Sequence, residues 1–423
     1  MGEYLVRCLG CGRVQPPRAL ACQNDDSLLR TEYFTKRLTL RDDLPGLWKF
    51  IDWLPVKEPL PRCGEKPVTY RSEGLARELG LENLYVSFSG YWPERGARMT
   101  TCSFKDLEAP PTVERMIERN DDQVLVVASA GNTARAFALA ASAVRLPLVL
   151  VVPPTGLDRL WISEKPGEEI CVISVNGDYT EAIDFAARLA ARHGFVGEGG
   201  ARNVARRDGM GVVMLDGVLS MRALPKHYFQ AIGSGTGGIA AWEASIRLIE
   251  DGRFGQTLPK LHLAQNTPCA PIYAAWTGSE MDKGRCPQGM YDDVLYNRKP
   301  PYAVGGGVRD ALEETAGEVY GITNREAEVA QKVFEESEEI DILPAAAVAV
   351  AALLAAVRSG AVEEKDLVLL NITGGGVSRA KEELEMNLLK CDIKAESSAL
   401  SKTSPSADDH LLAEIGEVLG RRS

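Results

Sequence analysis

The sequence VLVVASAGNT, at residues 124–133, joins an apolar run to a loop of small residues. Val124–Ala128 is typical of a short buried strand, because turn residues follow it at once. The alanine-rich stretch Thr133–Arg145 is predicted to be helical. A buried strand, a tight loop and a helix in this order indicate a parallel sheet that helices cover on both faces.

The same alternation continues along the chain and predicts an α/β protein with two doubly wound, mainly parallel sheet domains. Further strands are predicted at Leu84–Ser87, Leu148–Val152, Val212–Leu215, Tyr228–Ile232, Leu261–Ala264 and Leu367–Asn371. Further helices are predicted at Glu181–His193, Ile239–Glu250, Arg309–Thr315, Arg325–Ser337, Ala345–Val357 and Arg379–Leu389. Gly197–Gly211 is predicted to be a loop, and Ser397–Asp409 a polar linker.

The length of 423 residues exceeds what a single core normally supports, so we expect two domains. The expected division is a Cys-containing N-terminal appendage at 1–35, a larger α/β domain formed by 36–107 and 211–392, a smaller α/β domain at 108–210, and a polar C-terminal tail at 393–423.

Composition limits the partners and the location of the protein. A formal net charge of −11 disfavours nucleic acid and anionic membranes as partners. Met1–Tyr4 lacks the pattern of a secretion signal, and Pro344–Val357 is too short to cross a membrane. Nine scattered cysteines without such a signal favour reduced thiols, so we expect a cytoplasmic protein.

Lys105 lies in the sequence SFKD, in which Ser103 is suited to cap a helix that begins there. Partial burial beside Phe104 would lower the pKa of this amine and favour its covalent bonding to a carbonyl carbon. The alternative is an ordinary surface lysine.

Two later loops each follow a strand and open a helix, which directs backbone N–H groups at one point. Ser129–Thr133 is suited to a carboxylate, with Asn132 as an added side-chain donor, although a plain turn with Asn132 as its cap would have the same sequence. Gly233–Gly238 matches the GxGxxG pattern of dinucleotide sites, but the next predicted strand ends without the acid that holds the ribose. This loop is therefore predicted to bind a single phosphate.

Thr373 ends the last predicted strand, and three glycines follow it. Its hydroxyl is suited to a ring nitrogen, unless these residues form only a β-turn. Together, an amine nucleophile, an anion loop and a phosphate loop indicate pyridoxal-phosphate chemistry.

Cys8 and Cys11, with Cys22, resemble part of a zinc knuckle. Structural zinc takes four ligands, and no fourth Cys or His follows nearby. Asp25 is a candidate for the fourth place, but we expect no metal here.

The ordered motifs, over about residues 66–380, resemble the threonine-synthase branch of the fold-type II pyridoxal-phosphate enzymes. Residues 103–106 look like the lysine motif of that branch, 129–133 like its substrate-carboxylate loop, and 233–237 like its cofactor-phosphate loop. Tyr70–Leu75 resembles its usual opening, and Thr373 the residue that faces the pyridine nitrogen. The resemblance implies pyridoxal 5′-phosphate bound in the larger domain by Lys105, Asn132, Gly233, Ser234, Gly235, Thr236, Gly237 and Thr373.

A basic and aromatic segment, Phe88–Thr100, replaces the branch's usual asparagine-proline-threonine lead into the lysine. With ASAGNTAR at 128–135, the chain is most similar to the cysteate synthases, an archaeal offshoot that serves coenzyme M biosynthesis. That resemblance implies replacement of the phosphate of O-phospho-L-serine by sulfite, with Lys105 as the catalytic base and acid, in a homo-oligomer. Contacts to the small anionic substrates are expected from Ser129, Ala130, Gly131, Thr133, Arg71, Arg98 and Arg135, with Arg95 as a further candidate.

Three alternatives remain open at the level of the sequence. They are a threonine synthase acting on O-phosphohomoserine, a cysteine synthase using sulfide, and a non-catalytic protein that binds a partner through its Cys knuckle. The residues themselves do not separate sulfite from sulfide as the nucleophile.

Overall fold

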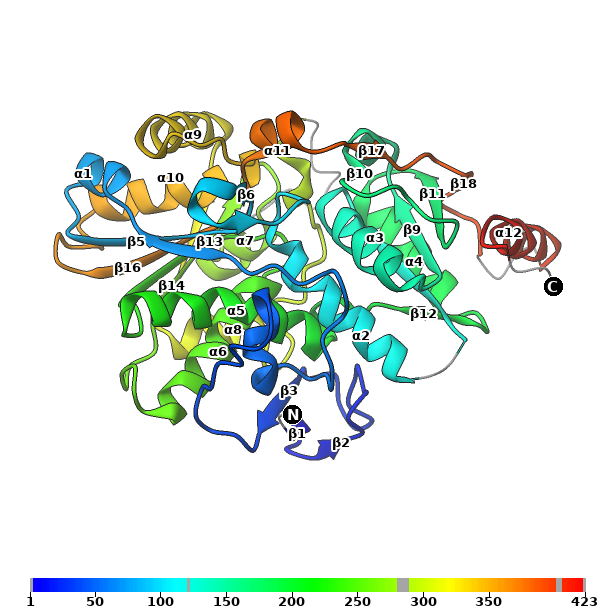
Figure 1. Cartoon of the computed structure of the whole chain (residues 1–423), viewed down its shortest axis with the longest axis horizontal. Helices are drawn as coiled ribbons and strands as arrows, with labels where there is room; N and C mark the ends of the chain where they lie inside the picture. Colours follow the sequence, from blue (N-terminus) through cyan, green and yellow to red (C-terminus); the bar gives the residue numbers. More distant parts are fainter. Residues whose placement is uncertain (1–2, 120–121, 280–288, 401–404, 421–423) are drawn as a thin grey trace.

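A computed structural model describes residues 3–119, 122–279, 289–400 and 405–420. The chain forms two α/β lobes side by side, with a small N-terminal sheet against their common lower face (Figure 1). The predicted fold class, two mainly parallel α/β units with an N-terminal appendage, is confirmed. No helix in the described ranges has the length and apolar character needed to cross a membrane.

The larger lobe is built on a six-stranded sheet in which only β4 runs antiparallel to its neighbour. Its spatial order is β15 (Glu318–Ile322), β14 (Lys260–Asn266), β13 (His227–Ala231), β16 (Leu367–Ile372), β5 (Asn83–Phe88) and β4 (Val68–Arg71). One face is covered by α1 (Gly74–Leu79), α9 (Asn324–Glu338) and α10 (Pro344–Arg358), and the other by α5 (Val204–Met221), α6 (Thr236–Asp251) and α8 (Val308–Glu314) (Figure 1).

The smaller lobe is built on a five-stranded sheet that is parallel throughout. Its spatial order is β12 (Phe195–Gly197), β8 (Val124–Ala128), β9 (Leu148–Val152), β11 (Ile170–Asn176) and β18 (Ile393–Glu396). Side chains alternate along each strand, so Leu125 and Val127 join the core under α2 (Ala109–Arg119) and α3 (Asn132–Val144). Val124 and Val126 pack instead with α4 (Tyr179–Ala190) and α12 (Pro405–Val418).

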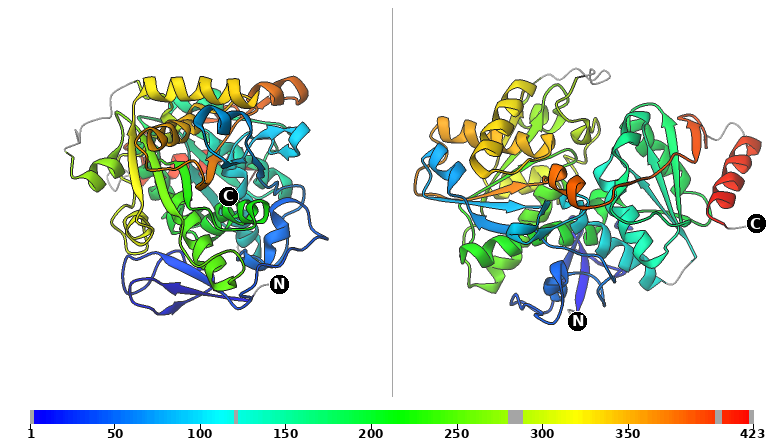
Figure 2. Two further views of the ribbon diagram at one scale, coloured as in Figure 1. Left: turned by 90° about the vertical axis from the view of Figure 1, so that its left-hand side faces the viewer. Right: turned by 45° about the horizontal axis from the view of Figure 1, so that its top comes forward.

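The N-terminal appendage is an antiparallel sheet in the order β2 (Val14–Gln15), β1 (Tyr4–Cys8) and β3 (Leu29–Tyr33). Figure 2 shows this sheet outside both lobes, on the side away from α9 and α10. It docks on α5, where the hydroxyls of Thr31 and Tyr33 both donate to Asp208 Oδ2, at 2.6 and 2.7 Å. Shorter elements complete the fold: hairpin β6 (Tyr91–Trp92) with β7 (Ala97–Arg98), pair β10 (Trp161–Ile162) with β17 (Asn387–Leu388), and helices α7 (Pro271–Thr277) and α11 (Val377–Glu383).

The predictions of a loop at Gly197–Gly211 and a strand at Val212–Leu215 are wrong, because α5 occupies most of both ranges. This helix is buried on nearly all sides, so its apolar residues show no one-sided period, and a short apolar run within it has the sequence of a buried strand. Gly209 lets α5 approach closely, since a Cβ at this position would lie 1.9 Å from the carbonyl oxygen of Leu107. The helix therefore packs directly against the turn that carries Lys105.

The C-terminal predictions also need correction. The predicted helix Arg379–Leu389 ends early, because α11 stops at Glu383 and the chain then forms β17 on its way to the smaller lobe. The predicted polar tail contributes β18 to the sheet, and the predicted linker Ser397–Asp409 runs into α12. Residues 401–404 of that linker lie outside the described ranges. The other predicted strands and helices overlap observed ones, whereas β4, β11, β12 and β15 of the two main sheets were not predicted.

Candidate active site

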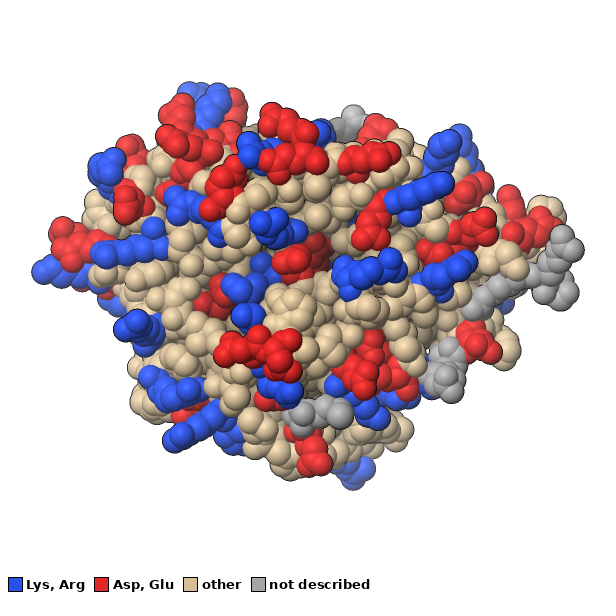
Figure 3. Space-filling model, viewed as in Figure 1, with Lys and Arg blue, Asp and Glu red and all other residues tan. Residues whose placement is uncertain are grey.

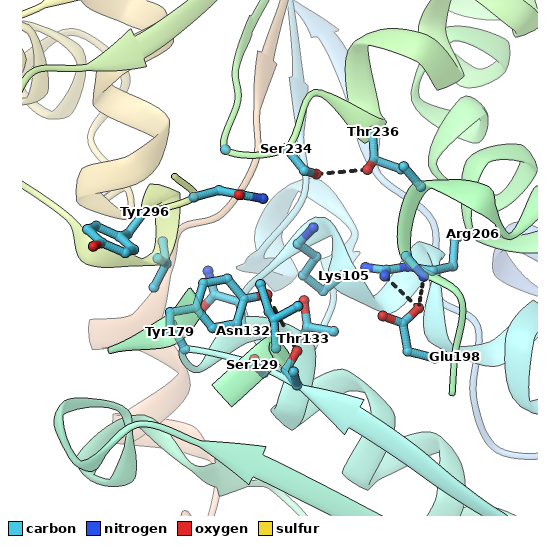
Figure 4. Close-up of a pocket in the computed structure, with 18 of the residues that line it drawn as sticks. Lys105, Ser129, Asn132, Thr133, Tyr179, Glu198, Arg206, Ser234, Thr236 and Tyr296 are labelled. Carbon is cyan, nitrogen blue, oxygen red and sulfur yellow. Dashed lines mark hydrogen bonds and ion pairs between the residues drawn. The ribbon is translucent and has the colours of Figure 1, made fainter. Parts of the chain in front are cut away.

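A cavity of about 630 Å³ lies between the two lobes, at the loops that follow β8, β13 and β16. Each of these loops leaves the carboxyl end of a parallel strand, which is where open α/β sheets bind ligands. Figure 4 shows Lys105 reaching into this space, with Ser234 and Thr236 on one side of it and Ser129 and Asn132 on the other.

Lys105 lies on a 3-10 turn, Phe104–Leu107, for which Ser103 provides the N-cap. The backbone N–H of Phe104 donates to the carbonyl oxygen of Thr373 at 3.0 Å, so this turn is fastened to the end of β16. The side chain of Lys105 is 23% exposed. Its pKa is lowered from the ordinary value, chiefly because burial removes water from the ammonium group, although the carboxylate of Glu108 opposes the shift. A larger share of this amine is therefore neutral near pH 7 than for a solvated lysine.

Glu108 connects Lys105 to a buried row of alternating charges. Its Oε2 lies 3.4 Å from Lys105 Nζ, and its Oε1 lies 2.6 Å from Arg206 Nη2. Arg206 Nη1 in turn lies 2.6 Å from Glu198 Oε2. Burial opposes ionisation of Glu108, but the charges of Arg206 and Lys105 prevail and keep its pKa below the ordinary value. The row holds Glu108 as a carboxylate beside the lysine.

The loop Ser129–Thr133 opens α3 and is folded around the hydroxyl of Ser129. Ser129 Oγ accepts hydrogen bonds from the backbone N–H groups of Gly131, at 3.0 Å, and Ala134, at 2.9 Å. Arg135 Nη2 donates to Asn132 Oδ1 at 2.6 Å, which leaves the amide nitrogen of Asn132 as a donor at the cavity wall. Because Ser129 takes two of the N–H groups at the start of α3, those of Asn132 and Thr133 are the ones left for an anion.

The loop 233–237 connects β13 to α6, and it lines the cavity throughout. Gly235 has φ +84°, and a Cβ at this position would lie 2.2 Å from Val308 Cγ2. Ser234 Oγ and Thr236 Oγ1 lie 2.8 Å apart, so two hydroxyls stand beside the backbone amides of the loop. Glycine backbone, paired hydroxyls and the first turn of a long helix are the features of a phosphate site.

These groups fit pyridoxal 5′-phosphate, because an amine, a phosphate loop and the Thr373 hydroxyl all face one cavity. Every residue predicted to bind the cofactor, and four of those predicted to bind substrate, line that cavity: Lys105, Ser129, Ala130, Gly131, Asn132, Thr133, Gly233, Ser234, Gly235, Thr236, Gly237 and Thr373. Their individual roles stay predictions.

The predicted substrate arginines lie elsewhere. Arg71 is on β4, where it donates to the carbonyl oxygen of Glu82 at 2.6 Å, and Arg98 is exposed on β7. Arg95 stacks at 4.2 Å over the ring of Tyr70. Arg135 is buried over the ring of Trp161, so it holds Asn132 from behind the wall of the cavity. None of these four arginines is among the residues that line the cavity.

The cavity is also lined by charged residues that the sequence analysis did not select: Asp184, Glu198, Arg202, Arg206 and Lys299. Three of them lie between 197 and 211, a stretch interpreted as a loop of no defined role. One feature of the sequence could have indicated them. Arg206, Arg207 and Asp208 are consecutive charged residues among glycines and apolar residues, and charged side chains are seldom buried unless they are paired.

Comparison with known proteins agrees with this geometry. A family model described as "Pyridoxal-phosphate dependent enzyme" matches residues 64–374. A protein of Methanococcoides burtonii named cysteate synthase is 55% identical over 419 residues, which cover 99% of each chain. A protein of the same name from Methanothrix thermoacetophila is 59% identical over 398 residues, covering 93% of this chain and 95% of the relative.

Solved structures of lower identity support the fold. Maize serine racemase superimposes with a TM-score of 0.56 at 15% identity, covering 74% of this chain and 91% of that structure. A threonine deaminase isoform from Solanum lycopersicum superimposes with a TM-score of 0.55 at 16% identity, covering 74% and 88%.

Proposed function

We propose that this chain, which belongs to the pyridoxal-phosphate-dependent enzymes and among them to the cysteate synthases, makes L-cysteate and phosphate from O-phospho-L-serine and sulfite. Relatives named cysteate synthase span nearly the whole chain, which favours this activity over threonine synthesis, over cysteine synthesis from sulfide and over a purely binding role.

The charge of the cavity is the structural observation that supports anionic substrates, and the relatives named cysteate synthase support these particular anions. Among the residues that the structure describes, four cationic side chains line it, Lys105, Arg202, Arg206 and Lys299, against two acidic ones, Asp184 and Glu198. The carboxylate of Glu108 lies behind this wall, between Lys105 and Arg206. The whole chain carries a formal charge of −11, and Figure 3 shows acidic and basic side chains intermingled over one face of the surface. Attraction for anions is therefore local to the cavity, as an enzyme that takes a phosphomonoester and a sulfur oxyanion requires.

The cofactor would be held by residues of four separate loops. Lys105 would bind its aldehyde, the N–H groups of 233–237 its phosphate, Thr373 its ring nitrogen and Asn132 a ring oxygen. When bound, pyridoxal phosphate supplies an electron sink for the negative charge that develops at the substrate's Cα.

Lys105 performs the proton transfers of the proposed reaction. Its Nζ removes the proton from Cα of the substrate, for which the lowered pKa is suited, and later returns the proton to Cα. Between these transfers the bond from Cβ to the phosphate oxygen breaks, and a bond from Cβ to the sulfur of sulfite forms. Inorganic phosphate leaves, so one anion replaces another at the same carbon.

The loops around the lysine hold the charged groups of the substrates. The first turn of α3, at 129–133, accepts the substrate carboxylate. Arg206 is committed to two carboxylates, and we assign it to the positioning of Glu108 rather than to substrate. Arg202 and Lys299 are assigned to phosphate and sulfite, since Arg202 is held chiefly by the backbone carbonyl of Asp26, at 3.0 Å, and the ion pair that Lys299 forms with Asp184, at 3.6 Å, is exposed.

The test is product analysis on the purified holoenzyme with three pairs of substrates. O-phospho-L-serine with sulfite should give cysteate and an equal amount of phosphate. Threonine from O-phosphohomoserine, or cysteine from O-phospho-L-serine and sulfide, formed faster than cysteate, would refute the assignment. Lys105→Ala should remove both turnover and the visible absorbance of lysine-bound cofactor, while Lys332→Ala, at a lysine that is 66% exposed on α9, should retain them.

We also propose that the enzyme acts in the cytoplasm as a homo-oligomer. The scattered free thiols support the cytoplasmic location, and the resemblance to the fold-type II pyridoxal-phosphate enzymes is what implies the homo-oligomer. Light scattering of the purified protein measures the mass of the assembly directly.

A further inference from the structure

We propose that the N-terminal appendage binds one structural Zn²⁺ through Cys8, Cys11, Cys22 and Asp25. The three sulfur atoms and a carboxylate oxygen of Asp25 all lie within 4.8 Å of one another. The three cysteines supply only three of the four ligands that structural zinc takes, and the fold places the Asp25 carboxylate where the fourth ligand is needed.

The distances match those of a tetrahedral zinc site. Ligands at about 2.3 Å from a tetrahedral zinc lie about 3.8 Å from each other. Cys11 Sγ and Cys22 Sγ are 3.5 Å apart, and Cys8 Sγ lies 3.2 Å from Asp25 Oδ1. Four donor atoms this close around one point need only small movements to surround an ion. Cys and Asp are both accepted zinc ligands, and three thiolates favour zinc over calcium or magnesium.

Two separate segments of the appendage supply these ligands. Cys8 and Cys11 lie at the turn between β1 and β2, which is closed by a hydrogen bond of 3.0 Å from Gly12 N to the carbonyl oxygen of Cys8. Cys22 and Asp25 lie in the segment that leads to β3. The backbone N–H of Asn24 donates to Cys22 Sγ at 3.3 Å, a contact that supports a thiolate at this position.

The size of the appendage explains why it would need a metal. Its own buried apolar cluster consists of Val6, Cys8 and Leu29, together with Val204 from α5. So few buried residues supply little stabilisation, and small units of this kind are commonly completed by a metal or by disulfides. A zinc ion would close the segment between β2 and β3, which has no strand of its own.

The proposed metal site adjoins the walls of the active site. Asp26, next to the proposed ligand Asp25, accepts a hydrogen bond from Arg202, which lines the cavity. Leu28 N donates to the carbonyl oxygen of Gly305 at 2.8 Å, and the segment before Gly305 contains Lys299 of the cavity wall. The ion would therefore fix the backbone that holds Arg202, and it would support the segment that follows Lys299 through the bond from Leu28 to Gly305.

The experiment is a measurement of zinc in the full-length holoenzyme, expressed with added zinc and purified by gel filtration. We expect about one zinc per chain, falling to less than about a tenth in the double variant Cys11→Ser/Cys22→Ser. Cys63→Ser and Cys391→Ser, at free cysteines far from the cluster in sequence, are matched controls and should keep the zinc.

Cobalt gives an independent readout. Co²⁺ exchanged into the wild type should show the long-wavelength d–d bands of a tetrahedral thiolate site, which lie beyond the absorbance of pyridoxal phosphate, and Asp25→Ala should shift them. The proposal is overturned if the wild-type protein contains no zinc. This holds both when all its thiols are free and when its mass shows a Cys11–Cys22 disulfide. It is also overturned if the double Cys variant keeps its zinc. These readouts use no enzyme activity, so they are independent of the proposed reaction.

Discussion

Replacing Gly235 by alanine should weaken cofactor binding by a predictable amount. The residue has φ +84°, and a left-handed backbone costs alanine about 1 kcal/mol relative to glycine. The added Cβ would lie 2.2 Å from Val308 Cγ2, an overlap that forces the loop or the valine to move. Overpacking of this kind costs about 1–3 kcal/mol, which gives about 2–4 kcal/mol in total.

Most of this cost should appear in the affinity for pyridoxal phosphate, because the loop can relieve the overlap only by moving away from the position that holds the phosphate. A loss of about 2–4 kcal/mol raises the dissociation constant roughly 30- to 900-fold. The assay is titration of the apoenzyme with pyridoxal phosphate, followed by the absorbance of the bound cofactor.

Gly252 provides a matched control at the other end of the same helix. It has φ +79°, and a Cβ there would meet no atom within 4 Å, so Gly252→Ala carries the backbone strain without the overlap. The Gly252→Ala variant should bind pyridoxal phosphate with the same affinity as the wild type.

Removing the obstructing methyl tests the cause directly. Val308→Ala takes away Cγ2, and the nearest remaining atom of Val308 is its Cβ at 3.4 Å, an ordinary contact. The double variant Gly235→Ala/Val308→Ala should therefore recover about 1–3 kcal/mol relative to the sum of the single changes. A dissociation constant for Gly235→Ala within about threefold of the wild type, or no recovery in the double variant, would refute the reasoning.

Two further changes probe the charges around Lys105. Arg206→Met takes from the buried Glu108 the closer of its two cationic partners, leaving Lys105 at 3.4 Å, and takes from the half-buried Glu198 its partner in the row. Denaturant unfolding should therefore show a loss of about 3 kcal/mol. Arg379→Met, at an arginine that is 39% exposed, should lose less than about 1 kcal/mol, and equal losses would contradict the argument. Burial raises the pKa of Asp106 from 3.8 to about 7. Between these two pH values the folded protein therefore binds a proton that the unfolded chain releases. The stability that this proton confers on the folded state declines as pH rises from about 4 to about 7. The free energy of unfolding of Asp106→Asn lacks this decline, so relative to the wild type it should rise by something on the order of 4 kcal/mol over that range. Denaturant unfolding at several pH values measures both. If the difference between the two free energies is constant with pH, the carboxyl is ionised throughout and the reasoning is wrong.

Much of the fold and of the cofactor site could be predicted because each part is contiguous in the sequence. Lys105, the loops 129–133 and 233–237, and Thr373 each stand at the end of a strand or the start of a helix, where local pattern carries the information. The structure brings all of them to one cavity.

The parts that were missed depend on contacts between distant segments. Arg206 is placed by α5, which is buried on both sides and so has no amphipathic pattern to mark it as a helix. Asp25 was a candidate ligand from its place in the sequence, but only the fold of two loops shows that its carboxylate lies within 4.8 Å of the three cysteine sulfurs. The predicted arginines were chosen by nearness in sequence to the motifs, and Arg71, for one, lies on an edge strand away from the cavity.

The pairing of β18 with β11 bears on how the protein is synthesised. Ile393–Glu396 covers the edge of Ile170–Asn176, a strand with six buried residues rich in valine and isoleucine. An open edge of that kind is a template for pairing with another chain and for aggregation. Because about 220 residues separate the two strands, the edge of β11 stays uncovered during synthesis until residues 393–396 have been made. A nascent chain that stalls before residue 393 would therefore carry an exposed sheet edge that is prone to pair with other chains.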